Sequence, residues 1–302
     1  MKKKPKLLVI GDNCFDITVK SDFGFAKDRN FIPEYYVSKP AGTGVNFAVS
    51  FSELGGSAVY YTPISKDSFG REISNFLSKK GVDISGKRSD LPTALIIAVV
   101  NSKGERTTFA LIKGTSYTEI SLKEFVQADL TEFDGIYISG GINTEVETGE
   151  EVLKIAKFAK ECHKKLYFDP QIRIGREIPG FIEISKEISE LSDILFANEE
   201  EISDIGQDIF KNRIIIEKRG ENGAAVFKNG REIFSVPGLR VRAKDTTGAG
   251  DAFNAAFLLN FLSGGSLEDS LIFGNKAGAV SVSKEGAYSP SFEEVENFDY
   301  EE

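Results

Sequence analysis

The second half of the chain alternates between short apolar runs and longer amphipathic stretches. Short apolar runs bounded by polar or turn residues predict buried strands. The stretch 150–164 instead has apolar residues at the spacing of one helix face, namely Val152, Ile155, Ala156 and Ala159. Alternation of this kind predicts an α/β fold, with a mostly parallel sheet covered by helices on both faces. The strands expected from Asp134 onward are Gly135–Ser139, Leu166–Phe168, Ile194–Ala197, Arg213–Glu217 and Ala224–Phe227.

The first half of the chain has a different pattern. Lys6–Gly11 is a short apolar run that predicts a strand, and Phe47–Leu54 predicts an apolar helix that ends at two glycines. Ala94–Val100 and Arg106–Ile112 predict two strands around a turn at 101–104. Residues from about 17 to 39 show no helical periodicity.

A buried helix is expected near the C-terminus, after three small residues. The almost wholly apolar run from Ala252 to Leu262 is too long for a typical strand and stops at Gly264. Gly248, Ala249 and Gly250 therefore open a helix, where free backbone N–H groups favour an anion. We expect Asp251, in the first turn, to have a lowered pKa because the helix dipole stabilises its charge. The same letters also fit a plain glycine-rich turn before a core helix.

An anion-binding turn beside a carboxylate suits one kind of chemistry in particular. Phosphoryl transfer to a hydroxyl needs N–H groups for the developing phosphate charge and a base for the hydroxyl proton.

The last predicted helix, Leu267–Ser283, begins after Ser266, a good capping residue. It carries Asn275 among apolar residues, which fits either a buried, hydrogen-bonded amide or a ligand contact.

Polar residues follow several of the predicted strands. Ligands of open α/β sheets gather at the carboxyl ends of the strands. Asp12 and Asp16 lie in an expected loop after the first strand, where either could instead cap a turn. Asn46 could cap the helix that follows it. The other polar groups are Asp169–Arg173, Asn198–Glu201 (alternatively an acidic helix start) and Lys218–Gly223 (alternatively a hairpin turn).

Composition places the chain among ordinary globular proteins. It has 302 residues, 41% hydrophobic and 27% charged, and a net charge of −9. The negative charge argues against a general nucleic-acid or anionic-membrane binder, so an anionic substrate needs a local positive site. Cys14 and Cys162 form no metal or redox spacing, and His163, the single histidine, lies among charged residues at a helix end. The apolar run after the N-terminal lysines is too short for a signal peptide, so we expect a cytoplasmic location.

The string Asp245-Thr-Thr-Gly-Ala-Gly-Asp-Ala-Phe253 resembles the C-terminal signature of the ribokinase-like (PfkB) carbohydrate kinases. Ala41–Asn46, Ser65–Gly70 and Gly81–Asp83 resemble the N-terminal signature, and the likeness covers Gly11 to about Gly286. The resemblance implies a ribokinase-like three-layer α/β/α sandwich with a mostly parallel sheet and a small β-lid. It further implies one kinase domain over 1–302, with lid segments at about 17–39 and 92–113.

The resemblance also implies roles for individual residues. Asp251 corresponds to the catalytic base, and Gly248, Ala249 and Gly250 form the anion hole. The substrate-binding residues implied are Asp16, Gly42, Asn46, Lys113, Arg173 and Asp251. The ATP-binding residues implied are Asn198, Lys218, Gly220, Gly223, Gly248, Gly250 and Asn275, with Glu201 at a Mg²⁺ ion. A monovalent cation is a further cofactor that the family allows.

Three positions depart from the family pattern. Ala41 stands where the family usually has glycine, Gln171 replaces Asn in an Asp-Pro-Asn-x-Arg motif, and Lys113 stands where Arg is usual. The motifs favour the fructokinase and 2-keto-3-deoxygluconate kinase branch. We expect an ATP-dependent kinase of a sugar or sugar acid that binds neither nucleic acid nor membrane and can form a homodimer through the lid. The alternatives are a nucleoside kinase and a non-catalytic sugar- or nucleotide-binding regulator.

Overall fold

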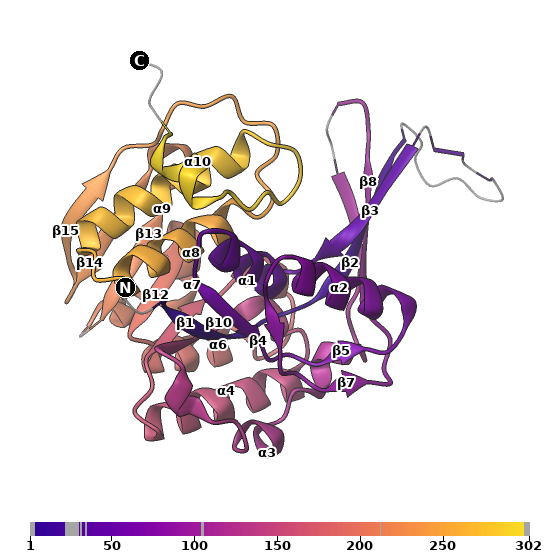
Figure 1. Cartoon of the computed structure of the whole chain (residues 1–302), viewed down its shortest axis with the longest axis horizontal. Helices are drawn as coiled ribbons and strands as arrows, with labels where there is room; N and C mark the ends of the chain where they lie inside the picture. The colour runs from indigo at the N-terminus through magenta and orange to yellow at the C-terminus, as the bar shows by residue number, and fades with distance from the viewer. Residues whose placement is uncertain are drawn as a thin grey trace.

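The computed structural model describes residues 4–21, 30, 32–33, 35–103, 106–211 and 213–298 (Figure 1). Within these residues, nine strands form one large sheet in which neighbouring strands are parallel, except that the strand next to one edge pairs antiparallel with both of its neighbours. In order across the sheet they are β15 (Arg231–Val236), β14 (Ala224–Lys228), β13 (Ile214–Lys218), β12 (Ile194–Asn198), β11 (Leu166–Asp169), β10 (Gly135–Ser139), β1 (Lys6–Ile10), β4 (Ser57–Tyr60) and β6 (Asp83–Ile84).

Helices cover both faces of the large sheet (Figure 1). One layer consists of α1 (Thr43–Glu53), α2 (Ser68–Lys79), α8 (Ala249–Leu262), α9 (Leu267–Val282) and α10 (Phe292–Glu296). The opposite layer consists of α3 (Leu122–Phe125), α4 (Val146–Glu161), α5 (Ile172–Gly175), α6 (Phe181–Leu191) and α7 (Glu199–Ile205). The α/β/α layering expected from the alternating pattern is therefore confirmed.

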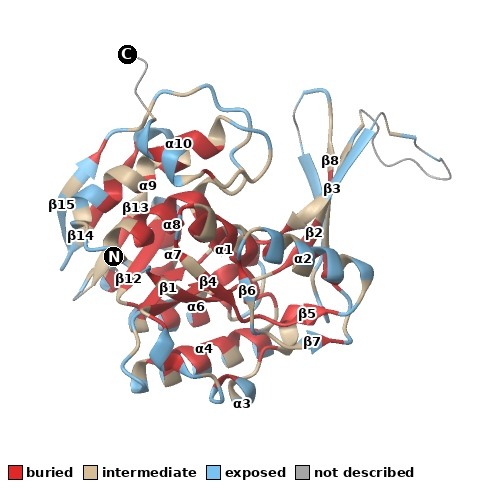
Figure 2. Ribbon diagram, viewed as in Figure 1, coloured by how far each residue is buried: buried red, intermediate tan, exposed pale blue. Residues whose placement is uncertain are grey.

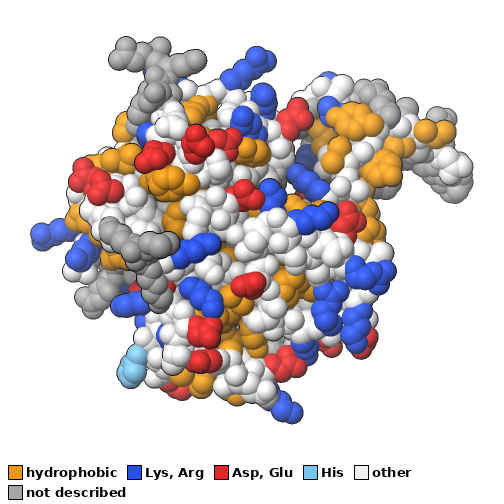
Figure 3. All heavy atoms as spheres, viewed as in Figure 1, with side chains coloured by type: hydrophobic (Ala, Val, Ile, Leu, Met, Phe, Trp, Pro, Cys, Tyr) orange, Lys and Arg blue, Asp and Glu red, His pale blue; other side chains and the backbone are white. Residues whose placement is uncertain are grey.

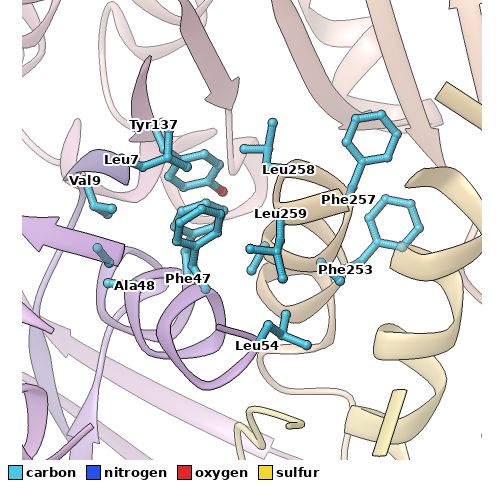
Figure 4. Close-up of a cluster of buried hydrophobic side chains, with 14 of the residues drawn as sticks. Leu7, Val9, Phe47, Ala48, Leu54, Tyr137, Phe253, Phe257, Leu258 and Leu259 are labelled. Carbon is cyan, nitrogen blue, oxygen red and sulfur yellow. The ribbon is translucent and has the colours of Figure 1, made fainter. Parts of the chain in front are cut away.

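Two apolar cores lie between these layers, because successive side chains of a strand point to opposite faces. Leu7 and Val9 of β1 belong to the core under α1 and α8, whereas Leu8 and Ile10 belong to the core under α4. Figure 4 shows the first core, where Phe47 of α1 stacks on Tyr137 of β10 with ring centroids 3.4 Å apart. Figure 2 shows both cores as the buried centre of the molecule. Apolar side chains surround α8, which explains why its sequence has no polar face.

A second, small sheet projects from the side of this body (Figure 1). Its strands run in the order β3 (Tyr35–Ala41), β2 (Cys14–Lys20), β8 (Ala94–Val100) and β9 (Arg106–Leu111). The two strands predicted at 94–112 are confirmed. Residues 22–29, 31 and 34 of the first expected lid segment, and Gly104 of the predicted turn, lie outside the described residues. A short parallel pair, β5 (Ile64–Ser65) and β7 (Arg88–Ser89), completes the sheets of the described chain.

Two predictions near the first strand were wrong. Asp16 lies within β2 rather than in a loop. Helix α1 starts at Thr43, not Phe47, so Asn46 lies inside its first turn and is not its capping residue. The cause is a long-range cap: the Asp12 carboxylate accepts hydrogen bonds from the Thr43 N–H (3.1 Å) and the Gly44 N–H (3.4 Å). The capping alternative for Asp12 is thus the observed one.

The remaining elements follow the predictions to within a few residues. The predicted helix 150–164 runs from Val146 to Glu161, and Ser266 caps α9 with its hydroxyl, as expected. The pattern predicts no strand at β4, β6 or β15. Of the helices that the structure describes, none is long and apolar enough to span a membrane.

Candidate active site

The polar strand ends meet at one edge of the large sheet, because the carboxyl ends of parallel strands lie together. Asp12 follows β1, and Asp169, Asn198 and Lys218 end β11, β12 and β13. The strands that follow β1 in the sequence lie on both sides of it: β4 and β6 on one side, and β10 to β15 on the other. Such a reversal of strand order opens a crevice at the carboxyl edge of the sheet. The N-terminus of α8 closes over it, since a side chain added at Gly250 would lie 3.7 Å from the Lys218 ammonium.

Helix α8 begins at Gly248, whose φ of 77° is in the left-handed region that favours glycine. Its first N–H groups have no acceptor within the helix. Among the described residues, neither the Gly250 N–H nor the Asp251 N–H donates a hydrogen bond. Both groups therefore remain available to an anion at the positive end of the helix dipole.

Asp251 lies in the first turn of α8 and is only 4% exposed. Its Oδ2 accepts a hydrogen bond from the Asn46 amide of α1 at 3.2 Å. Its Oδ1 is buried and has no hydrogen-bond partner among the described residues. A buried carboxylate oxygen without a donor is a free acceptor, as a base that takes a hydroxyl proton must be.

The predicted lowering of the Asp251 pKa was wrong. Burial, and next the neighbouring Asp169 carboxylate, raise the pKa of Asp251 well above its usual value. The Asn46 hydrogen bond and the Lys218 ammonium act in the opposite direction but do not outweigh them. The helix dipole lowers the pKa of a carboxyl only modestly, whereas removing its negative charge from water raises the pKa by more. A raised pKa also brings the group nearer to the pH at which a general base is most effective.

Beneath Asp251 lies a buried polar cluster that the motifs do not identify in full. Asp169, fully buried, accepts hydrogen bonds on Oδ2 from the Lys218 ammonium (2.5 Å) and the Asn254 amide (2.6 Å). The Asn254 amide also donates to the Tyr137 hydroxyl at 3.1 Å. Asn254 lies one turn after Asp251, so the cluster fixes α8 to β10 and β11. One signal in the sequence points to this cluster, because Asn254 interrupts a largely apolar helix.

Glu201 and Asn198 form the N-terminal cap of α7. The Asn198 side chain accepts the Glu201 N–H and the Glu201 Oε2 accepts the Asn198 N–H, both at 2.9 Å. Glu201 Oε1 accepts the Ile172 N–H at 3.2 Å. Burial, followed by the Asp169 charge, raises the pKa of Glu201, while the Lys218 ammonium lowers it. Asn198–Glu201 therefore forms the acidic helix start that the sequence analysis gave as the alternative. The Glu201 carboxylate also faces the Asp169 cluster.

Lys218 is the cation of this cluster. Burial alone would lower the pKa of its ammonium, but the Asp169 and Glu201 carboxylates outweigh burial and raise the pKa. The ammonium thus stays charged beside the start of α8. Although it pairs with Asp169 at 2.5 Å, it differs from a surface ion pair because it lies beside the free N–H groups of α8, which add to its attraction for an anionic substrate.

On the other side of Asp251, Asn46 and Gly42 come from the start of α1. Gly42 has φ 116°, and a side chain there would overlap the Asp12 backbone. Asp16 lies farther out on β2 and is half-buried; burial raises the pKa of its carboxyl against the lowering effects of Lys39 and Arg106. Ala41 ends β3 opposite Cys14 and is buried.

The remaining predicted site residues are less closely grouped. Gly220 and Gly223 form the expected hairpin turn between β13 and β14. Asn275 is half-buried and its amide donates to the Pro237 carbonyl at 2.9 Å. This is the hydrogen-bonded amide that the sequence analysis gave as the alternative to a ligand contact. Lys113 and Arg173 are exposed, and neither forms a hydrogen bond or ion pair among the described residues.

A surface groove of about 610 Å³ lies elsewhere, near the amino end of β1. It contains none of the predicted site residues. Its lysines are already paired with carboxylates, Lys6 with Glu132 at 2.7 Å and Lys87 with Glu124 at 3.0 Å. The converging chemistry of the molecule is therefore at the carboxyl edge of the sheet.

Comparison with known proteins agrees with this geometry. The model of the pfkB family of carbohydrate kinases matches residues 4–294. The protein named "Probable fructokinase-7" of Arabidopsis thaliana is 30% identical over 291 residues, which cover 85% of this chain and 83% of that protein. The 5-dehydro-2-deoxygluconokinase of Clostridium beijerinckii is 25% identical, over 86% of this chain and 84% of that protein. The crystal structure of a Xylella fastidiosa fructokinase with bound ATP superposes with a TM-score of 0.85 at 19% identity and covers 97% of both chains.

Proposed function

The chain belongs to the pfkB family of carbohydrate kinases, phosphotransferases with an alcohol group as acceptor, and we propose that it transfers the terminal phosphoryl group of ATP to a hydroxyl of a hexose or keto-deoxy sugar acid. The relatives named as a fructokinase and a 5-dehydro-2-deoxygluconokinase support these two substrate types. The single observation that carries the mechanism is the buried, unpaired Oδ1 of Asp251 beside the free N–H groups of α8.

The arrangement assigns the proton and the phosphate charge to different parts of one helix turn. Asp251 Oδ1 accepts the proton of the attacking hydroxyl, while Asn46 holds the carboxylate by its other oxygen. Of the turn that begins with Gly248, the free N–H groups of Gly250 and Asp251 stabilise the charge on the transferring phosphoryl group. The Ala249 N–H, which the family resemblance also implied, instead donates to the Thr246 carbonyl at 3.4 Å. Lys218, beside Gly250, supplies the positive charge that such a group requires.

The acceptor lies between α1 and the small sheet in this proposal. Gly42 and Asn46 contact it from the helix and Asp16 from β2, where a carboxylate can accept sugar hydroxyls. Arg173 and Lys113 are assigned to the acceptor by family resemblance, and both are exposed at the rim.

The nucleotide lies along the β13–β14 hairpin in the same proposal, with Gly220, Gly223, Asn198 and Asn275 as its contacts. Among the described residues no cluster of three or more metal-binding side chains exists. Mg²⁺ nonetheless needs only one or two carboxylates when phosphate oxygens complete its shell. Asp169 fits, since its buried Oδ1 has no partner among the described residues, and Glu201 lies beside it. Held there, Mg²⁺ would neutralise phosphate charge.

The proposal is tested with Asp251→Asn. We expect kcat to fall roughly 10²–10⁴-fold, the usual contribution of a general base. The measurement is ADP release from Mg·ATP over a panel of fructose, ribose, 2-keto-3-deoxygluconate, fructose phosphates and adenosine. Asp208→Asn is the matched control, because Asp208 is exposed and its carboxylate pairs with Lys211 at the surface. A loss below about tenfold would remove Asp251 from the role of base.

The same panel separates the alternatives. Turnover of adenosine alone would make the chain a nucleoside kinase. Thermal-shift binding of ATP and a sugar without turnover would make it a binding protein. Repeating the assay with K⁺, Na⁺ or neither tests the predicted monovalent-ion effect.

We also propose that residues 1–302 act as one kinase domain and that two copies associate through the small sheet. Tyr36 and Leu111 of this sheet are 66% and 50% exposed. Figure 3 shows hydrophobic side chains gathered on the projecting sheet. Apolar surface of this kind is typical of protein interfaces.

A further inference from the structure

Lys39 is a half-buried lysine of the small sheet that none of the predicted roles uses. It lies directly opposite Asp16 in the β2–β3 register, so both side chains extend from the same face of the sheet. That face is the one that meets the body of the molecule at the active site. Among the described residues, the Lys39 ammonium forms no hydrogen bond and no ion pair. Its charge acts at longer range on two carboxylates, those of Asp16 and Asp245.

The ammonium of Lys39 packs against Gly286, in the loop after α9. A side chain added at Gly286 would collide with the Lys39 Nζ, and the φ of 72° at Gly286 independently favours glycine. The Lys39 ammonium therefore occupies the space beside the Gly286 backbone.

Gly286 in turn holds the turn that leads into α8. Its N–H donates to Asp245 Oδ2 at 3.1 Å, and Asp245 Oδ1 accepts the Thr247 N–H at 2.9 Å. Burial would raise the pKa of Asp245, but the hydrogen bonds from Thr247 and Gly286, together with the positive charge of Lys39, outweigh it and lower the pKa. Lys39 is thus close enough to stabilise the charge of Asp245 without contacting it.

The next residue completes the connection to the anion hole. A side chain added at Gly248 would lie 2.8 Å from Ala287 Cβ and 3.7 Å from the Asn46 amide. The loop 286–287 therefore forms the back of the turn whose N–H groups face the phosphoryl group. A series of contacts thus runs from Lys39 through Gly286 and Asp245 to the 246–250 turn.

We propose that Lys39 is a positioning residue for phosphoryl transfer. Its ammonium, carried by the small sheet, stabilises the Asp245 carboxylate and the 286–287 loop, and so fixes the 246–250 turn in the geometry that transfer needs. This inference rests on the proposed kinase function. It links the sheet that carries the acceptor-binding Asp16 to the turn that binds the phosphoryl group.

Kinetics distinguish positioning from substrate binding. Displacing a reacting group by about 1 Å can cost roughly 10²-fold in rate, so Lys39→Met and Lys39→Gln should each lower kcat about 10- to 100-fold. The KM for the sugar should rise by a smaller factor than kcat falls, because Lys39 affects the acceptor through the charge that it places beside Asp16. Lys39→Arg, which keeps the charge, should retain kcat within about threefold. The matched control is Lys284→Met in the same loop, whose ammonium lies over the Tyr288 ring, 5.7 Å from its centroid.

Two kinetic results would overturn the proposal. A raised sugar KM with unchanged kcat would make Lys39 a substrate ligand, and unchanged kcat and KM would leave it no role in the reaction. A double variant supplies an independent check. If Lys39 acts through Asp245, adding Lys39→Met to Asp245→Asn should lower kcat little further, whereas a fully multiplicative loss contradicts the path.

Hydrogen exchange tests the inference even if no sugar is turned over. The N–H groups of Gly286 and Thr247, both bonded to Asp245, should exchange faster in Lys39→Met than in the wild type and in Lys284→Met. Unchanged exchange at these two amides, in a variant with a wild-type melting temperature, would refute the proposal. Absence of turnover by the wild type would instead count only against the kinase function.

Discussion

At the residue scale, the environment of Asp251 combines reactivity with a cost in stability. The carboxyl is buried beside Asp169, which raises its pKa. A carboxyl whose pKa is higher in the folded chain binds its proton more tightly when folded. Folding stability from this group is therefore greatest at low pH and declines as pH rises from its usual value of 3.8 to the folded pKa. Above the folded pKa the whole penalty persists.

Asp251→Asn should consequently stabilise the protein near neutral pH while it removes activity. Each unit of pKa elevation is 1.36 kcal/mol, and 1 kcal/mol shifts the melting temperature of a large domain by about 2 °C. We expect a gain of a few degrees at about pH 8 that disappears below about pH 4. The check is the melting temperature of both proteins across that range. A gain that is the same at every pH would mean that titration of Asp251 is not its cause.

Asp208→Asn is again the control. The Lys211 ion pair lowers the pKa of Asp208, so that carboxylate favours folding above its usual pKa, and its removal should not raise the melting temperature at high pH. Because the pair is exposed, the expected change is small.

The sequence predicts individual residues where a motif keeps them close along the chain. Gly248 to Asp251 and the Asn198–Glu201 cap lie where the motifs imply. Contacts between distant segments were not predictable from spacing: Asn254 and Asp169 are 85 positions apart, and Lys39 meets Gly286 only in the fold. The error in the Asp251 pKa has the same origin, since burial and the Asp169 charge depend on tertiary structure.

At the scale of elements, the periodic pattern predicts interiors better than ends. The strands β10 to β14 and the helices α8 and α9 match the pattern, because burial on both faces of a sheet leaves continuous apolar runs. The start of α1 was missed because its cap, Asp12, comes from the loop after β1, 31 positions before Thr43. Strand β15 was missed because its residues are mostly exposed and its burial pattern is that of an edge strand.

The two ends of α8 offer a matched test of the anion hole. Gly248 and Gly264 both have positive φ, 77° and 96°, so alanine is strained at either end. An added side chain would meet Ala287 at Gly248 but nothing within 4 Å at Gly264. We expect each alanine variant to lose roughly 1–2 kcal/mol of stability, with the larger loss at Gly248.

Activity should separate the two variants more sharply than stability. Gly248→Ala should lower kcat by about 10²-fold, because it displaces N–H groups that stabilise the transferring phosphoryl group. Gly264→Ala should leave kcat within about threefold of the wild type, since this residue lies a whole helix away from the chemistry. Steady-state kinetics and denaturant unfolding of both variants provide the check. Equal losses of kcat would contradict an anion hole at the start of α8.

At the scale of the whole molecule, parallel strands explain why residues from distant motifs share a site. Their carboxyl ends lie at one edge, and the strand order turns back on either side of β1. The alternation of apolar runs predicts this class of sheet, and the family resemblance supplies the expected lid. The pattern does not contain the strand order or the packing of the small sheet against the body, because these depend on contacts between distant residues.

The two faces of the small sheet differ in where their charged residues lie. The register places Asp16 and Lys39 on the face toward the active site. On the opposite face it aligns Tyr36, Val19 and Val99 across three strands. Ile17 in the next row inward packs against the core of the body, so the uncovered part of this face is its outer part. An apolar face on a projecting sheet costs free energy when it is left in water. A second copy of the chain, which brings an identical face, can cover it with a closed twofold interface.

Tyr36→Lys should therefore weaken the predicted homodimer. Light scattering after size-exclusion chromatography should give about twice the chain mass for the wild type and, at the same concentration, a larger monomer fraction for the variant, because an interface with unpaired charge is strongly disfavoured. Ile233→Lys is the matched control, since Ile233 is 51% exposed but lies on β15 of the large sheet. A monomeric wild type, or dissociation by Ile233→Lys alone, would exclude the small sheet as the interface. The opposite face of the same strands carries Asp16, so dissociation of the dimer should also raise the KM for the sugar. Measuring this KM at protein concentrations above and below the dimer dissociation constant tests whether dimerisation affects sugar binding.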